Sequence, residues 1–200
     1  MKKITFVTTN KGKISSAMQY LGDLDIEVVP YNHELVEPRT DDIQEIAKQK
    51  VLQAYELVKH PCIAMDSGFY IEALNGFPRA FVNFALDTIG IDGILKLMEG
   101  KENRKCKFTE CLSYYDGDNL YQFSGYDKGK LSTRVLGNDS NKKWSDLWYI
   151  YIPEGFDKTL AQMNDEERYS RKENKSEYTK SSLEEFAKWY INKNNNKNEN

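Results

Sequence analysis

The sequence contains few of the residues that build metal clusters, catalytic triads and disulfide frameworks. It has two histidines, His33 and His60, which lie in separate predicted loops. This argues against a zinc cluster and against a Ser-His-Asp triad. Its three cysteines, Cys62, Cys106 and Cys111, are an odd number in a chain without a recognisable secretion signal, which argues against a disulfide framework. We therefore expect them to be structural thiols.

Long apolar segments are missing as well. No segment reaches the length of a membrane span, and the N-terminal apolar run is too short for a signal peptide, so we expect a cytoplasmic protein that binds no membrane. The net charge of −3 and the pI near 5.6 argue against a general nucleic-acid surface and confine any basic site to a local pocket. We expect one domain over residues 1–191 and a disordered, Asn-rich tail over residues 192–200.

Hydrophobic periodicity predicts alternating strands and helices in the first part of the chain. The expected elements are strands at 4–8 and 26–30, a helix at 12–21, a longer helix capped by Asp41 and Asp42, an antiparallel hairpin within 105–133, and a last helix opened by Ser181 and Glu184.

Two segments carry residues suited to chemistry. Residues 62–65 predict a buried strand that leads to Asp66, followed by a turn at Ser67 and Gly68 and a short hairpin-like element that closes at Asn75 and Gly76. Such an arrangement presents a carboxylate at a cleft. The N-terminal strand leads into a small polar turn and the first turn of a helix, where amides and lysines can receive an anion. Together the segments predict one site for phosphate and metal.

The spacing in both segments is specific. Thr8, Asn10 and Lys13 form one motif, and a second consists of Asp66, Ser67, Gly68, Ala73, Leu74, Gly76 and Pro78. These motifs resemble those of the inosine triphosphate pyrophosphatase family, whose members hydrolyse deaminated purine nucleoside triphosphates to monophosphate and pyrophosphate. The resemblance covers roughly the first two thirds of the chain and weakens after Leu136.

The resemblance implies a fold, a cofactor and a set of site residues. The implied fold is mixed α/β, with a long twisted mixed sheet flanked by helices, two lobes, a nucleotide cleft between them, and a homodimeric assembly. Mg²⁺ would be held by Glu37, through a one-residue shift in alignment, and by Asp66, which also activates water. The implied phosphate-binding residues are Thr8, Asn10, Lys13, Lys50, Ser67 and Gly68. For Lys50, placed by its ungapped spacing to Asp66, a solvated lysine is the alternative.

Several positions depart from the family pattern. Met65 replaces an acid, and a thioether does not ligate a hard cation. Trp144 begins the segment nearest to an aromatic-Asp-Pro motif that stacks on the base. The family's Ser-His-Arg triplet falls by spacing on residues 172–174, with no histidine. Arg168, Arg171 or Lys172 would then donate to O6 of the base, in either of two registers, and a solvated charged face is the alternative.

These departures leave two functions open. The first is a magnesium-dependent pyrophosphatase that acts on ITP, dITP or XTP. The second is a catalytically impaired nucleotide sensor that reports to an effector protein, with antiviral defence as one setting. Because the departures affect catalysis and base recognition while the phosphate-binding residues persist, the sequence favours the sensor.

Overall fold

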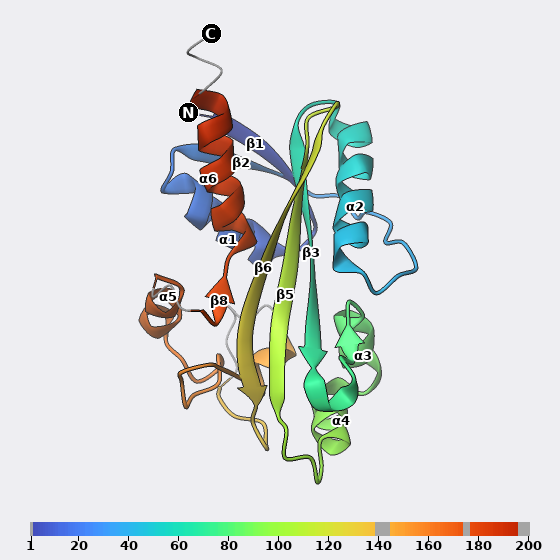
Figure 1. Ribbon diagram of the computed structural model, residues 1–200, viewed down its shortest axis with the longest axis vertical. Helices are drawn as coiled ribbons and strands as arrows, with labels where there is room; N and C mark the ends of the chain where they lie inside the picture. The colour runs from blue at the N-terminus through green and yellow to red at the C-terminus, as the bar shows by residue number, and fades with distance from the viewer. Residues whose placement is uncertain (1, 139–144, 174–176, 196–200) are drawn as a thin grey trace. The chain divides into compact units, whose positions relative to one another are not determined.

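The computed structural model describes residues 2–138, 145–173 and 177–195 (Figure 1). The strands are β1 (Lys2–Val7), β2 (Ile26–Tyr31), β3 (Cys62–Ile71), β4 (Pro78–Arg79), β5 (Lys105–Tyr115), β6 (Leu120–Leu131), β7 (Tyr151–Pro153) and β8 (Thr179–Lys180). The helices are α1 (Lys11–Gly22), α2 (Ile43–Val58), α3 (Val82–Thr88), α4 (Gly90–Leu97), α5 (Asp165–Glu173) and α6 (Ser182–Asn195), with 3-10 turns η1 (Glu72–Leu74) and η2 (Asp146–Tyr149).

The strands form one mixed sheet. Their order is β2-β1-β3-β5-β6-β7, with β4 paired to β3 and β8 paired to β6. β1 runs parallel to β2 and β3, whereas β4, β7 and β8 pair antiparallel with their neighbours. The expected mixed α/β fold with a helix-flanked sheet is therefore confirmed.

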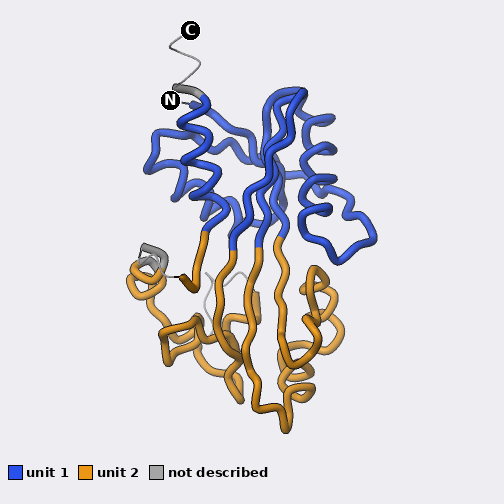
Figure 2. Tube along the Cα trace, viewed as in Figure 1, with its two compact units in different colours: residues 1–66, 110–125, 181–200 blue, residues 67–109, 126–180 orange. Residues whose placement is uncertain are grey.

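The chain divides into two compact units, coloured separately in Figure 2. Unit 1 comprises residues 1–66, 110–125 and 181–200, and unit 2 comprises residues 67–109 and 126–180. The expectation that residues 1–191 form one domain stays a prediction.

In unit 1 both faces of the sheet are covered by helices. Along β3, Ile63 and Met65 belong to an apolar cluster shared with α1 and α6, whereas Cys62 and Ala64 belong to one shared with α2. Successive side chains of a strand point to opposite faces. Burial on both faces explains why this run is continuously apolar, and the same alternation turns Asp66 toward α2.

The structure corrects the expected turn at Ser67 and Gly68. β3 continues through both residues, and the chain turns later, where Asn75 and Gly76 have positive φ angles of 53° and 87°. Gly68 lies within the strand because β4 passes close to it. A Cβ atom on Gly68 would lie 2.8 Å from the carbonyl oxygen of Arg79. The glycine therefore marks the close approach of two strands.

Two helices begin at the caps that the sequence predicts. The Oδ1 atom of Asp42 accepts hydrogen bonds from the amides of Gln44 and Glu45, at 2.9 and 3.4 Å. At the start of α6, the Oγ atom of Ser181 accepts one from the amide of Glu184 at 3.4 Å. Both contacts satisfy amides that the first helical turn leaves unpaired.

The end of α6 differs from the expected boundary of the tail. The helix runs past residue 191 to Asn195, and residues 196–200 lie outside the described part of the chain. Lys193 accounts for the extension, because its Nζ atom lies 2.7 Å from a carboxylate oxygen of Asp116. The same ammonium lies 4.8 Å from the ring centroid of Trp189 and 4.6 Å from that of Tyr121.

All three cysteines are buried and free, as expected. Burial raises the pKa of the Cys62 thiol to about 12 and that of Cys111 to about 11, and it raises the pKa of Cys106 as well. Thiols in such surroundings are poor nucleophiles, which supports a structural role.

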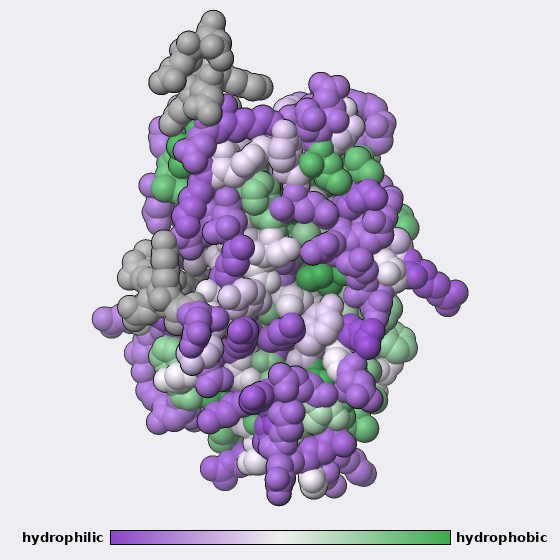
Figure 3. Space-filling view, in the orientation of Figure 1, coloured by the Kyte–Doolittle hydropathy of each residue, from purple (hydrophilic) through white to green (hydrophobic). Residues whose placement is uncertain are grey.

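The surface visible in Figure 3 is mainly hydrophilic, with small and separate apolar areas. Among the described residues, no helix has the length and apolar character that a membrane span requires.

We expect Asp42→Ala to lower the free energy of unfolding by about 1 kcal/mol, since it removes the acceptor for two amides at the start of α2. Asp42→Asn keeps an acceptor oxygen and should cost much less. Urea denaturation of the two variants measures the difference, and equal losses would show that the cap contributes nothing specific.

Candidate active site

The first motif folds into the turn that starts α1. The Oγ1 atom of Thr8 accepts a hydrogen bond from the amide of Asn10 at 3.1 Å, and the Oδ1 atom of Asn10 accepts one from the amide of Lys13 at 3.0 Å. Asn10 is thereby the N-cap of α1. The amides of a helix N-terminus attract anions, and Lys13 adds a positive charge to the first turn.

The side chain of Lys13 extends from α1 to β3. Its Nζ atom donates a hydrogen bond to the carbonyl oxygen of Met65 at 3.2 Å. Burial lowers the pKa of the Lys13 ammonium, and the negative charge of Asp66 offsets this effect only in part. In the described part of the chain no carboxylate forms an ion pair with Lys13, so this cation is suited to bind a phosphate.

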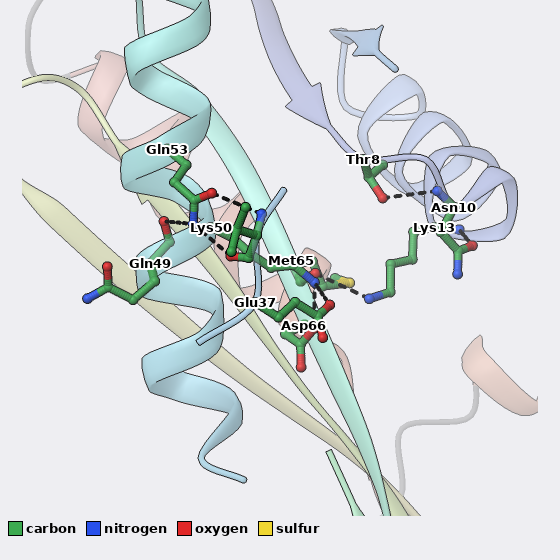
Figure 4. A network of polar contacts seen from close by, with 10 residues as sticks. Thr8, Asn10, Lys13, Glu37, Gln49, Lys50, Gln53, Met65 and Asp66 are labelled. Atoms are coloured by element: carbon green, nitrogen blue, oxygen red, sulfur yellow. Dashed lines mark hydrogen bonds and ion pairs between the residues drawn. The ribbon is translucent and has the colours of Figure 1, made fainter. Parts of the chain in front are cut away.

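Lys50, on α2, brings two carboxylates together. Its Nζ atom lies 2.5 Å from Oε1 of Glu37 and 2.8 Å from Oδ1 of Asp66, as the dashed lines in Figure 4 show. Glu37 comes from the segment before α2, and Asp66 from β3. The side chain of Asp66 is 8% exposed, whereas that of Glu37 is 57% exposed. The two oxygens converge on one cationic position.

The charge of Lys50 is strongly favoured at this position. Burial opposes its protonation, but the negative charges of Asp66 and Glu37 and their hydrogen bonds outweigh that effect and raise the pKa of the ammonium above its usual value. Lys50 therefore stays protonated over the physiological pH range, and its charge is available to both carboxylates.

The donor set also fits a magnesium ion that arrives with a nucleotide. Mg²⁺ is commonly bound by one or two carboxylates together with water and substrate phosphates, and Glu37 and Asp66 supply two carboxylates aimed at one point. Within residues 2–138, 145–173 and 177–195, no group of three or more histidine, cysteine or acidic residues is placed to hold a metal. The phosphates would thus complete the coordination.

Met65 and Asp66 face opposite sides of β3. Met65 is 6% exposed and packs in the apolar cluster of α1 and α6, and Figure 4 shows it on the side of Lys13. The carboxylate of Asp66 instead meets Lys50. The family's acid at position 65 would therefore face Lys13 here, so its replacement by methionine changes the surroundings of Lys13 first.

Sequence reasoning missed Gln53. This residue follows Lys50 by one helical turn, and its side-chain amide forms hydrogen bonds with both backbone groups of Val36, the residue before Glu37. The spacing of three residues from Lys50, on a shared helix face, was a signal in the sequence. The backbone partner was not visible there, because Val36 lies in an irregular segment.

The remaining predicted phosphate-binding residues, Ser67 and Gly68, belong to unit 2. They follow Asp66 directly on β3. Their phosphate-binding role stays a prediction.

The predicted base-binding residues also fall in unit 2. Arg168 donates hydrogen bonds to the carbonyl oxygens of Leu160 and Met163, so its guanidinium holds the chain before α5. Arg171 forms an ion pair with Asp127 at 2.6 Å, and its Nε atom is buried. Of the other two, Trp144 and the side chain of Lys172 lie outside the described residues.

Comparison with known proteins agrees with the motifs. Residues 4–180 match the model of the Ham1 family, and the chain belongs to this family. A dITP/XTP pyrophosphatase from Thermococcus kodakarensis is 36% identical over 187 residues, which cover 94% of this chain and 96% of that protein. Another, from Methanopyrus kandleri, is 38% identical over 193 residues, covering 95% and 97%. The resemblance read from the two motifs is confirmed.

Solved structures share the fold. A HAM1 protein from Coxiella burnetii superposes with a TM-score of 0.79 at 20% identity, covering 96% of this chain and all of that one (100%). The Ham1 protein of Staphylococcus aureus gives a TM-score of 0.67 at 22% identity, covering 82% and 88%.

We expect Lys13→Met to weaken binding of a nucleoside triphosphate by at least about tenfold, because a charge-assisted hydrogen bond to phosphate contributes roughly 1.5–3 kcal/mol. The free energy of unfolding should not fall, since the variant removes a half-buried cation that has no carboxylate partner. Calorimetric titration and urea denaturation test the two statements. Full binding by the variant would place the phosphates elsewhere.

Proposed function

We propose that this protein binds the deaminated purine nucleoside triphosphates ITP, dITP and XTP and hydrolyses them, with Mg²⁺, to the monophosphate and pyrophosphate. The observation that carries the proposal is the convergence of Glu37 and Asp66 on one cationic position, next to the cation of Lys13. The names of the relatives support it, because they are dITP/XTP pyrophosphatases with 34–38% identity over nearly the whole chain. We thus place the enzyme before the nucleotide sensor, whereas the sequence alone favoured the sensor.

The proposed reaction needs a base and groups that bind the phosphates, and different residues supply them. A water molecule must attack the α-phosphorus in line with the leaving pyrophosphate and lose a proton. Asp66 is the proposed base, since its carboxylate is buried at the end of the unit 1 part of β3 and forms an ion pair with Lys50. Lys13 and the N-terminal amides of α1 are the proposed partners of the phosphates.

Glu37 and Asp66 are the proposed ligands of the metal ion. When bound, Mg²⁺ supplies positive charge that offsets the charge developing on the phosphate oxygens. To receive it, the two carboxylates must release the ammonium of Lys50, which then becomes available to a phosphate.

Arg171 is the proposed reader of the base. Hypoxanthine and xanthine present an acceptor at O6 where adenine presents an amino group, so a donor aimed at O6 leaves adenine unpaired. The side chain of Arg171 is 10% exposed, and within the described residues its Nε atom has no hydrogen-bond partner. Arg168 is the weaker candidate, because it already binds two carbonyl oxygens.

The second candidate is a nucleotide sensor with impaired catalysis that acts on an effector protein. Met65 favours it, because the family's acid at this position is replaced by a buried thioether. The role in antiviral defence stays a prediction from the sequence, since none of the described contacts bears on it.

We further propose a homodimer that uses unit 2. Four large apolar side chains on α3, on α4 and next to them are exposed, namely Phe81, Phe84, Ile89 and Leu97, and Phe84 reaches 69% exposure. Exposed apolar groups of this size are common at protein interfaces.

Purified protein with dITP and Mg²⁺ should release pyrophosphate, and Asp66→Asn should lower the rate by at least about a hundredfold, since it removes the base. dATP serves as the control substrate and should be hydrolysed far more slowly. Met65→Glu places a carboxylate beside Lys13, and we expect it to weaken nucleotide binding. Quantifying pyrophosphate and titrating the nucleotide by calorimetry separate rate from affinity.

The outcomes distinguish the two candidates. Tight binding of dITP without pyrophosphate release would replace the enzyme by the sensor. Hydrolysis that survives Asp66→Asn would remove Asp66 from the role of base. Equal rates of hydrolysis of dITP and dATP would contradict the proposed selectivity.

For the assembly, we expect light scattering to give twice the chain mass for the wild type and the single mass for Phe84→Asp, because a charge is costly to bury in an apolar interface. Leu24→Asp, at a side chain of unit 1 that is 43% exposed, is the control and should remain dimeric. A dimer that tolerates Phe84→Asp would exclude this surface.

A further inference from the structure

We infer that Gln53 is a positioning residue that holds Glu37 in place for cation binding. The inference rests on the proposed function, because it assigns Glu37 as a ligand of the metal ion. Gln53 does not contact the cation position itself; it acts on the backbone of the residue before Glu37.

The side chain of Gln53 binds both backbone groups of Val36. Its Oε1 atom accepts a hydrogen bond from the Val36 amide at 2.9 Å, and its Nε2 atom donates one to the Val36 carbonyl oxygen at 2.8 Å. A second bond from Nε2, to the carbonyl oxygen of Gln49 at 3.2 Å, fixes the amide group against its own helix. Figure 4 shows these contacts beside Lys50 and Glu37. The two bonds engage the amide and the carbonyl group of Val36 as a neighbouring strand would, and they fix the position of its backbone.

Three consecutive residues thus meet α2 in three different ways. Leu35 is buried in the apolar cluster that contains Val51. Val36 is bound through its backbone by Gln53, while its side chain is 75% exposed. Glu37 then reaches Lys50 with its carboxylate. The contact between Gln53 and the backbone of Val36 fixes the direction of the chain after the buried Leu35. It thereby determines where the carboxylate of Glu37 lies.

Glu37 depends on such support, whereas Asp66 does not. Asp66 stands on a central strand with its side chain almost fully buried, so its neighbours fix its position. Glu37 has a side chain 57% exposed and lies in a segment, residues 32–42, that is neither helix nor strand. Ordering an exposed side chain on an irregular segment costs conformational entropy. Groups that orient metal ligands from outside the coordination shell lower that cost.

The test measures cation binding directly. Mn²⁺ is titrated into the protein saturated with a non-hydrolysable analogue of dITP, and free Mn²⁺ is followed by electron paramagnetic resonance, with the same titration of the analogue alone as the reference. Gln53→Met keeps the length of the side chain and loses the hydrogen bonds, and we expect it to weaken Mn²⁺ binding by roughly tenfold. Gln49→Met is the matched control one turn earlier, where the side-chain amide binds Glu45 and not the segment of Glu37. It should bind Mn²⁺ like the wild type.

A double-mutant cycle separates positioning from general stability. If Gln53 acts through Glu37, then Gln53→Met should add nothing to the loss that Glu37→Gln already causes. If Gln53 contributed only to the stability of the fold, the double variant would instead show the full loss of Mn²⁺ binding caused by Gln53→Met in addition to that caused by Glu37→Gln. Gln53→Asn, whose amide is too short to reach both groups of Val36, is the second variant and should behave like Gln53→Met.

The failures of the two proposals are distinguishable. If Glu37→Gln weakens Mn²⁺ binding but Gln53→Met and Gln53→Asn do not, the positioning role is overturned and the metal ligand stands. If Glu37→Gln binds Mn²⁺ like the wild type, the assignment of Glu37 in the proposed function is wrong, and the inference falls with it. Additive losses in the cycle would also overturn the inference.

Discussion

The ion pairs of Lys50 are the interaction on which the site depends. A single ammonium connects the segment before α2, the helix itself and the central strand β3, through Glu37 and Asp66. Without it, two carboxylates that converge on one point would repel each other, and the buried one would lose its charge partner. The pairing gives the almost completely buried carboxylate of Asp66 an opposite charge at 2.8 Å.

The alternation of side chains along β3 divides the positive charges between two surroundings. Asp66 belongs to the face of α2, where Lys50 has two carboxylates, and Met65 belongs to the face of α1, where Lys13 meets a carbonyl oxygen. A step of one residue along a strand therefore separates a cation in two ion pairs from a cation that, among the described residues, forms none. In the proposed function, the carboxylates held by Lys50 would receive the metal ion and the ammonium of Lys13 would receive the phosphates.

Short-range patterns made a large part of this site predictable. The motif of Thr8, Asn10 and Lys13 works through hydrogen bonds between near neighbours, and the ungapped spacing from Lys50 to Asp66 fits a helix followed by a strand. Periodicity predicted individual strands and helices, whereas the mixed sheet was implied by the resemblance of the motifs to a known family. These features depend on local rules that a sequence displays directly.

Features that depend on distant backbone groups were not predictable. The strand continues through Gly68 because a second strand approaches it, and α6 continues past residue 191 because Lys193 finds Asp116 on the hairpin of β5 and β6. Gln53 was missed for the same reason, since its partner is the backbone of an irregular segment. A single sequence carries no pattern for such contacts.

The packing of Trp189 gives the molecule an internal optical reporter. Its indole lies among Tyr114, Tyr121 and Phe123 with the ammonium of Lys193 nearby, and it is the sole tryptophan in the sequence of unit 1, since Trp144 and Trp148 fall in that of unit 2. Replacing the latter two by phenylalanine would leave an emission that follows the loosening of unit 1 alone. Local opening of unit 1 can then be followed through the wavelength and intensity of this emission, without any added label.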